Sequence, residues 1–148
     1  MWSRSKSLML SRVMVYIFYA VLIVLCGSLP WLLRWYMDSL GKQESLFLPL
    51  MSGLYLSALA AFVALFCLDR LLLNMRQGHV FTSQNVKLLR FLSWSCYVVS
   101  LLFFAFCVYY VAGAIIALLA AFAGLIVRVV KNVFAEALEL KQENDLTV

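Results

Sequence analysis

The feature that most constrains this chain is a run of thirty-five residues, from Ser93 to Val127, without a single charged side chain. A helix rises about 1.5 Å per residue, so a straight helix of this length would be roughly 50 Å long, against a hydrocarbon core of about 30 Å. The run therefore predicts two membrane crossings joined by a turn. Gly113, which tolerates turn geometry, and the interfacial side chains of Tyr109 and Tyr110 place that turn near the middle of the run.

Two further apolar runs, residues 13–33 and 47–68, are each about as long as one crossing. Hydrophobic residues make up 66% of the chain and charged residues 13%, with a mean hydropathy of +0.97, which a soluble core of this size cannot bury. The sequence thus predicts an all-α fold, an integral membrane four-helix bundle of two transmembrane hairpins. We expect one membrane domain, residues 1–148, with helices at about 13–35, 47–73, 92–111 and 114–140, a loop at 74–91 and a tail at 128–148.

Lysine and arginine are distributed unequally between the connections, and short cytoplasmic segments collect these residues. Ten of the twelve lie before the first span, between the second and third spans, or after the fourth. Only Arg34 and Lys42 fall in the first loop, where Asp38 and Glu44 offset them. Both termini are therefore expected to be cytoplasmic, and the net charge of +5 reflects this topology. The sequence shows no basic and aromatic surface of useful size, so it does not predict direct binding of nucleic acid.

Small residues at spacings of four form a stripe on two of the predicted helices. Because lipid provides little hydrophobic drive between helices, close backbone approach at small residues supplies the contact. We predict that the two stripes meet each other inside the bundle, with a homo-oligomer interface as the alternative. The stripes consist of Gly53, Ser57 and Ala61 on the second helix and of Gly113, Ala117 and Ala121 on the fourth.

The sequence predicts no catalytic, cofactor or metal site. No ionisable residue lies deep in any predicted span, which disfavours a pump or a proton-coupled transporter. His79, the only histidine, lies in the predicted cytoplasmic loop and lacks partners for nucleophilic or metal chemistry. The four cysteines have no CxxC spacing and are expected to behave as small apolar residues. We therefore expect that the protein is not an enzyme.

The predicted cytoplasmic loop contains residues suited to a protein contact. Thr82 or Ser83 is placed to cap a helix that carries an apolar stripe along the membrane surface. Basic residues of this helix would either reach lipid headgroups or form a docking surface for an acidic protein element. The candidate partner-binding residues of the loop are Phe81, Asn85, Lys87 and Arg90.

The tail has a polar and largely acidic face if the fourth helix continues past the bilayer, because its polar residues then recur at spacings of four, three and four. The anionic cytoplasmic leaflet would not attract this face. We therefore predict contact with the basic loop or with a separate protein, a merely solvated helix end being the alternative. The candidate partner-binding residues of the tail are Asn132, Glu136, Glu139, Glu143 and Asn144.

Three segments, Gly78–Arg90, Phe134–Ala137 and Leu140–Val148, resemble in order and spacing a bacterial family of small four-pass membrane proteins of unknown function. The family commonly has a glycine where Ala137 stands and a second basic residue near Leu88. The resemblance implies an inner (plasma) membrane protein that is often encoded beside a very short helix-turn-helix regulator of the Cro type. It supplies no activity.

The leading hypothesis is a non-catalytic membrane protein whose loop and tail hold a cytoplasmic partner, such as that small regulator, at the bilayer. The alternative is a transport-related or immunity-like protein that acts through its transmembrane helices. A third hypothesis is a sensor of envelope stress or of a small hydrophobic molecule. The three hypotheses differ in whether the tail or the helix bundle carries the function.

Overall fold

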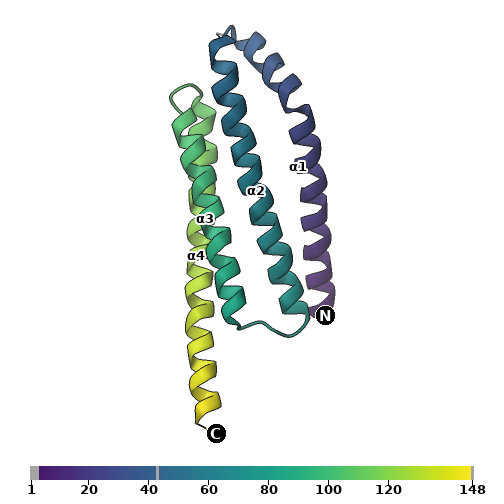
Figure 1. Ribbon diagram of the computed structural model, residues 1–148, viewed down its shortest axis with the longest axis vertical. Helices are drawn as coiled ribbons and strands as arrows, with labels where there is room; N and C mark the ends of the chain where they lie inside the picture. The colour runs from purple at the N-terminus through teal and green to yellow at the C-terminus, as the bar shows by residue number, and fades with distance from the viewer. Residues whose placement is uncertain (1–3, 43, 148) are drawn as a thin grey trace.

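The computed structural model describes residues 4–42 and 44–147, which form four long helices joined by short connections (Figure 1). Each helix is long and apolar enough to cross a membrane, which confirms the predicted all-α four-helix fold of a multi-pass membrane protein. The helices are α1 (Arg4–Leu40), α2 (Phe47–Arg76), α3 (Ser83–Phe106) and α4 (Val111–Leu146), and a short 3-10 helix, η1 (Glu44–Leu46), precedes α2.

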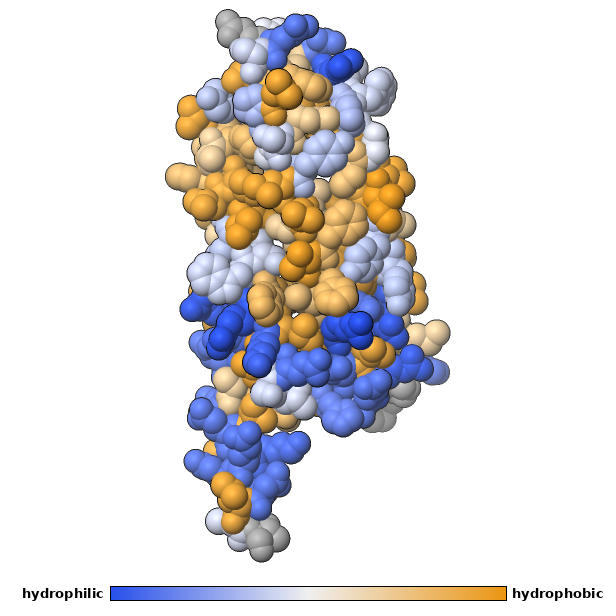
Figure 2. Space-filling model, viewed as in Figure 1, coloured by the Kyte–Doolittle hydropathy of each residue, from blue (hydrophilic) through white to orange (hydrophobic). Residues whose placement is uncertain are grey.

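The surface is divided into an apolar middle and two hydrophilic ends (Figure 2). The α2–α3 loop, the start of α1 and the last turns of α4 lie together at one end (Figure 1). We call this the basic end, since it carries Arg76, Lys87, Arg90, Arg128 and Lys131. The α1–α2 and α3–α4 connections form the opposite end. This arrangement of chain segments is the one that the apolar runs predict.

The helices pack in sequence order, with α2 between α1 and α3 and with α4 against α3. The prediction that the small-residue stripes of α2 and α4 meet each other is therefore wrong. A Cβ atom at Gly53 would overlap the ring of Phe106 from α3. A Cβ atom at Gly113 would lie 3.0 Å from the carbonyl oxygen of Phe103, also from α3. Both stripes allow close approach, but α3 is the neighbour that they share.

The remaining stripe residues differ in burial. Ala117 is buried, and its carbonyl accepts a hydrogen bond of 2.7 Å from the hydroxyl of Ser100 on α3. Ser57 is buried and donates to the carbonyl of Gly53 within α2. Ala61 and Ala121 are half-buried. Packing in this fold is thus tightest between α3 and its two neighbours.

Most helices are longer than predicted, and two of the changed boundaries bear on the site. The α3–α4 turn lies just before Val111, and Gly113 belongs to the first turn of α4, where it makes room for α3 instead of providing a turn. Helix α3 begins at Ser83, because the hydroxyl of Thr82 accepts a hydrogen bond from the backbone N–H of Asn85 and caps it. The separate surface helix expected before α3 is therefore the first part of α3 itself. Residues 83–106 contain no proline or glycine that would end a surface helix before the apolar part of α3 begins.

Helix α1 continues through Pro30, and α2 compensates for the hydrogen bond that proline removes. Proline has no backbone N–H, so the carbonyl four residues earlier, that of Cys26, loses its helical donor. The hydroxyl of Tyr55 on α2 donates to this carbonyl over 3.1 Å. A backbone group at membrane depth has no water to bond, so the tyrosine satisfies an acceptor that would otherwise be unpaired.

Contacts at both ends fasten α1 to the rest of the molecule. Near the basic end, Arg12 Nε lies 3.1 Å from Asp69 Oδ1 of α2. At the opposite end, Lys42 Nζ donates to the carbonyl of Tyr109 over 2.7 Å and lies 4.5 Å from the centre of the Tyr110 ring. The connection after α1 therefore reaches the α3–α4 turn, which closes the opposite end of the bundle.

Candidate functional site

The α2–α3 loop at the basic end is built around one buried amide, that of Asn85. Its Nδ2 donates to the carbonyls of His79 and Val80 over 2.8 and 2.7 Å, and its Oδ1 accepts from Asn74 Nδ2 over 2.7 Å. The side chain is 0% exposed, so it cannot reach a partner. Asn85, predicted as a partner-binding residue, is instead a positioning residue that fixes the loop.

Phe81 connects this loop to α4. Its ring packs edge-on against that of Phe134, with 5.3 Å between the centroids and 62° between the planes, and the side chain is still 38% exposed. The loop and the base of the tail touch through these two rings, whereas the predicted contact was between the acidic face of the tail and the basic loop. In the part of the chain that the structure describes, no ion pair joins the loop to the tail. Phe81 thus holds the loop against the base of the tail and presents one edge to the surroundings.

The other candidate residues are exposed. Lys87 and Arg90 lie on the outer surface of α3, and neither forms an ion pair with a carboxylate of residues 4–42 or 44–147. On α4 the exposed candidates are Asn132, Glu136, Glu139, Glu143 and Asn144. Every candidate residue of the tail is therefore accessible, whereas the candidate residues of the loop include both exposed and buried ones.

The tail is the direct continuation of α4, which extends beyond the other helices at the basic end (Figure 1). All residues from 139 to 147 are exposed. The exposed set includes apolar side chains, since Val133 is 56% exposed and Leu140 is 61% exposed. Thr147 ends the helix, and its hydroxyl donates to the carbonyl of Glu143 over 2.7 Å. The result is an amphipathic helix without a packing neighbour along its last turns.

A small hollow of about 200 Å³ lies between α3 and α4, also at the basic end. It is lined by Arg90, Ser93, Trp94, Arg128 and Lys131. Ser93 is buried and its hydroxyl donates to the carbonyl of Gly124 over 3.1 Å, which joins the two helices at the base of the hollow. Three cationic side chains thus converge on one site.

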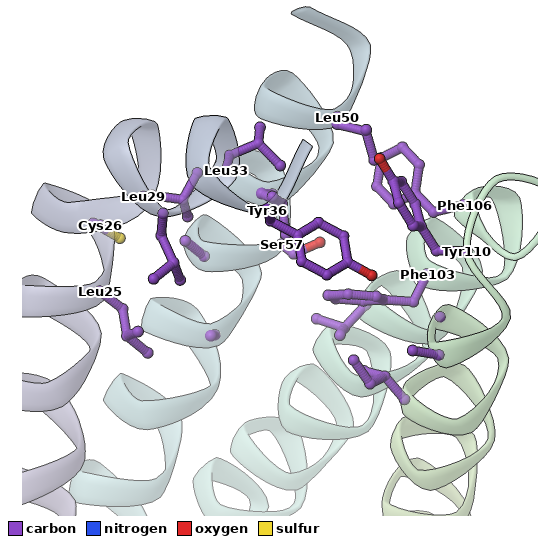
Figure 3. A pocket seen from close by; sticks show the side chains of 18 of the residues that line it. Leu25, Cys26, Leu29, Leu33, Tyr36, Leu50, Ser57, Phe103, Phe106 and Tyr110 are labelled. Atoms are coloured by element: carbon purple, nitrogen blue, oxygen red, sulfur yellow. The ribbon is translucent and has the colours of Figure 1, made fainter. Parts of the chain in front are cut away.

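A larger cavity, of about 680 Å³, lies between α1, α2 and the α3–α4 turn, toward the opposite end (Figure 3). Its walls are almost entirely apolar and include Leu29, Leu54, Ala61, Val99, Phe103 and Ile116. Tyr110 is also a lining residue of the cavity. Its hydroxyl is buried and has no hydrogen-bond partner among the described residues. The volume lies within the range of small-molecule sites, about 300–1,000 Å³.

Within residues 4–42 and 44–147, no three His, Cys, Asp or Glu side chains lie close enough to share a metal ion. The cysteines Cys26, Cys67, Cys96 and Cys107 are unpaired. The linings of the two hollows present cationic, aromatic and apolar side chains.

The sequence was compared with protein families, curated proteins and solved structures. Residues 8–148 match the family described as "protein of unknown function (DUF2975)". The chain belongs to the DUF2975 family. No curated protein and no solved structure shows a significant match to it. Membership of DUF2975 agrees with the family of unknown function that the loop and tail segments resemble.

Two features of this DUF2975 chain were missed by sequence reasoning. From sequence, Arg128 and Lys131 indicate topology only, although their spacing of three puts them on one side of a helix. From sequence, the Tyr110 side chain indicates the membrane interface, whereas the burial of its hydroxyl depends on contacts with distant segments. The first feature was visible in the spacing, whereas the second required the tertiary structure.

Proposed function

We propose that this protein is a non-catalytic membrane tether whose basic end faces the cytoplasm and whose tail binds a protein there. The partner that we propose is a small protein with a basic surface, such as a short helix-turn-helix regulator of the kind implied by the family resemblance. Binding would hold this regulator at the membrane and away from its other targets. The projecting amphipathic end of α4 is the single observation that carries the proposal.

Charge supports a basic partner. Residues 136–147 contain four carboxylates, Glu136, Glu139, Glu143 and Asp145, and one cation, Lys141. A surface with this balance is repelled by an anionic leaflet and attracted by a basic protein. DNA-binding proteins carry basic surfaces, so a small regulator meets this requirement.

Apolar surface supports a protein partner over simple solvation. Val133 and Leu140 lie seven residues apart, on one side of α4, and both are more than half exposed. An amphipathic helix in water gains stability when its apolar side is covered by a complementary groove. Leu140 would therefore act as an apolar anchor, with the acidic residues at the rim.

The test measures binding of a purified short helix-turn-helix regulator, of the kind that the family resemblance implies, to the full-length protein in detergent micelles. Glu139→Gln/Glu143→Gln should weaken binding about fivefold, the effect of losing two exposed charge pairs. The matched control is Asp38→Asn/Glu44→Gln, which removes two exposed acids at the opposite end and should leave affinity unchanged. Equal recovery of the regulator after deletion of residues 136–148 would contradict the proposal.

The apolar cavity favours a second candidate function, in which the transmembrane helices bind a hydrophobic molecule as a transport-related or immunity-like protein or a sensor. Its volume and its apolar walls together match an apolar ligand. This function would depend on the bundle and not on the tail.

A dibrominated fatty acid serves as the probe, because Trp35 lines the cavity and bromine quenches indole fluorescence on contact. Ala61→Phe, which fills the cavity, should remove the quenching. Ala105→Phe on the exposed surface of α3 should retain it. If deletion of residues 136–148 abolishes the cellular phenotype while Ala61→Phe preserves it, this second candidate is excluded.

A further inference from the structure

We propose that the hollow between α3 and α4 at the basic end binds the phosphate group of an anionic phospholipid. The site includes the first residues of the tail, Arg128 and Lys131, and lies nearer the apolar band than the acidic residues 136–147. Its walls are Arg90, Ser93 and Trp94 on one helix and Arg128 and Lys131 on the other.

Local helix geometry puts these side chains together. On α3, Arg90 is followed by lining residues three and four positions later, which places all of them on one side of the helix. On α4, Gly124, Arg128 and Lys131 follow one another at spacings of four and three and share a side in the same way.

Close contact between the two helices fixes the base of the hollow. A Cβ atom at Gly124 would lie 3.0 Å from Tyr97 Cε1 and 3.2 Å from Cys96 Cβ, so a larger residue there would press against these two side chains of α3. The hydroxyl of Ser93, which is 2% exposed, then reaches the Gly124 carbonyl. The contact between Gly124 and Ser93, which lies within about two turns of the cationic residues along each helix, therefore holds the cationic side chains beside one another.

The charges in the hollow are not compensated by protein groups. Helix α3 contains no acidic residue. None of the three cations forms an ion pair with a carboxylate of the described chain, where the salt bridge is that between Arg12 and Asp69. Three like charges around about 200 Å³ repel one another, and a bound anion removes that repulsion. Two guanidinium groups are suited to phosphate, which they bind through paired N–H donors.

The depth of the hollow identifies the phosphate as that of a lipid. Arg128 is the first charge after the uncharged run, so the hollow lies where the apolar band meets the basic end. Trp94, which is 57% exposed, forms part of the wall, and tryptophan favours the headgroup level of a bilayer. Exposed Phe91 and Leu125 flank the lining residues in sequence and offer surface to acyl chains. The hollow holds a phosphate, while the acyl chains lie against the helices outside it.

The experiment is native mass spectrometry of the full-length protein in micelles, with phosphatidylglycerol and phosphatidylcholine of identical acyl chains as probes. Phosphatidylglycerol should bind at one site with at least about tenfold higher affinity than phosphatidylcholine. In Arg90→Gln/Arg128→Gln/Lys131→Gln, that affinity should fall by on the order of 100-fold, from about fivefold for each charge near a membrane surface. Arg90→Lys/Arg128→Lys, which keeps the charge but loses the paired N–H donors, should bind phosphatidylglycerol more weakly than the native protein and more strongly than the glutamine variant.

The matched control is Arg76→Gln/Lys87→Gln/Lys141→Gln, which removes three exposed charges at the basic end outside the hollow. It should retain phosphatidylglycerol binding. Equal loss in the control and hollow variants would overturn the proposal, since it would show general surface attraction. Displacement of the lipid by millimolar inorganic phosphate, or by a peptide of residues 136–147, would also overturn it in favour of a free anion or the tail of another copy. None of these outcomes depends on the regulator, so the lipid site and the tether are tested separately.

Discussion

The hydrogen bond from Tyr55 to the Cys26 carbonyl leads to a prediction that links two helices through a missing backbone group. Tyr55→Phe removes the hydroxyl and keeps the ring. The Cys26 carbonyl then has no donor, because Pro30 cannot supply the N–H that would bond it within α1. Pro30→Ala restores that N–H, so the tyrosine hydroxyl should become dispensable.

The size of the effect follows from the setting. Hydrogen bonds between membrane helices contribute about 0.6 kcal/mol on average and up to about 1.7 kcal/mol. An acceptor left unpaired in a buried site costs about 1–3 kcal/mol. Hydrocarbon offers no water to replace the lost donor, so we expect Tyr55→Phe to lower the free energy of unfolding by about 1 kcal/mol. In the Pro30→Ala background the same change should cost close to zero, so the coupling energy should also be about 1 kcal/mol.

The assay is reversible unfolding of the four proteins of this double-mutant cycle in mixed micelles, with the loss of helicity recorded against the fraction of denaturing detergent. Tyr109→Phe is the matched control, because Tyr109 is exposed near the α3–α4 turn, and the bond that it contributes uses its backbone carbonyl. An equal cost of Tyr55→Phe in both backgrounds would refute the link to Pro30. The hydroxyl would then stabilise the fold in some other way.

Three further predictions concern α3 and the loop that precedes it. Asn85→Leu leaves loop carbonyls unpaired and should lower the free energy of unfolding by about 2 kcal/mol, with faster tryptic cleavage after Arg76, at the start of the α2–α3 loop, but unchanged helicity. Gly53→Ala forces a Cβ atom into the ring of Phe106 and should cost about 1–3 kcal/mol in thermal unfolding, most of which Phe106→Leu should restore. Phe81→Ala should cost about 1 kcal/mol and raise amide hydrogen exchange in the loop, and adding Phe134→Ala should cost little more, since both residues form one contact.

The fold could be predicted from sequence because its determinants are local. Length and hydropathy of each run specify a crossing, and the positions of lysine and arginine group the same three segments at one end. These properties require no knowledge of which helix touches which. The pairing of helices could not be predicted in the same way, because a small-residue stripe fits any surface that approaches closely. The ring of Phe106 fills the space at Gly53, and nothing in the spacing of α2 indicates a phenylalanine on α3.

The sequence predicts only the part of the candidate site that depends on local patterns. The acidic face of the tail depends only on helical spacing, so its residues are exposed together as expected. Asparagine is usually a surface residue, and the burial of Asn85 depends on Asn74, eleven positions away on another helix. The hollow at Arg128 and Lys131 likewise requires Arg90 from α3. Local patterns therefore identify faces, whereas sites formed between helices need the tertiary structure.

The continuity of α4 has a mechanical consequence. Its 36 residues form one helix with no proline, about 54 Å long at 1.5 Å per residue. The first turns, at Ala112 and Ile116, form part of the wall of the apolar cavity, and the last turns form the exposed tail. A helix of this kind acts as a stiff rod, so a tilt or rotation imposed at one tip displaces the other tip without any hinge between them. A force on the cavity end of α4 inside the bilayer therefore shifts the position of the exposed tail in the water beyond it.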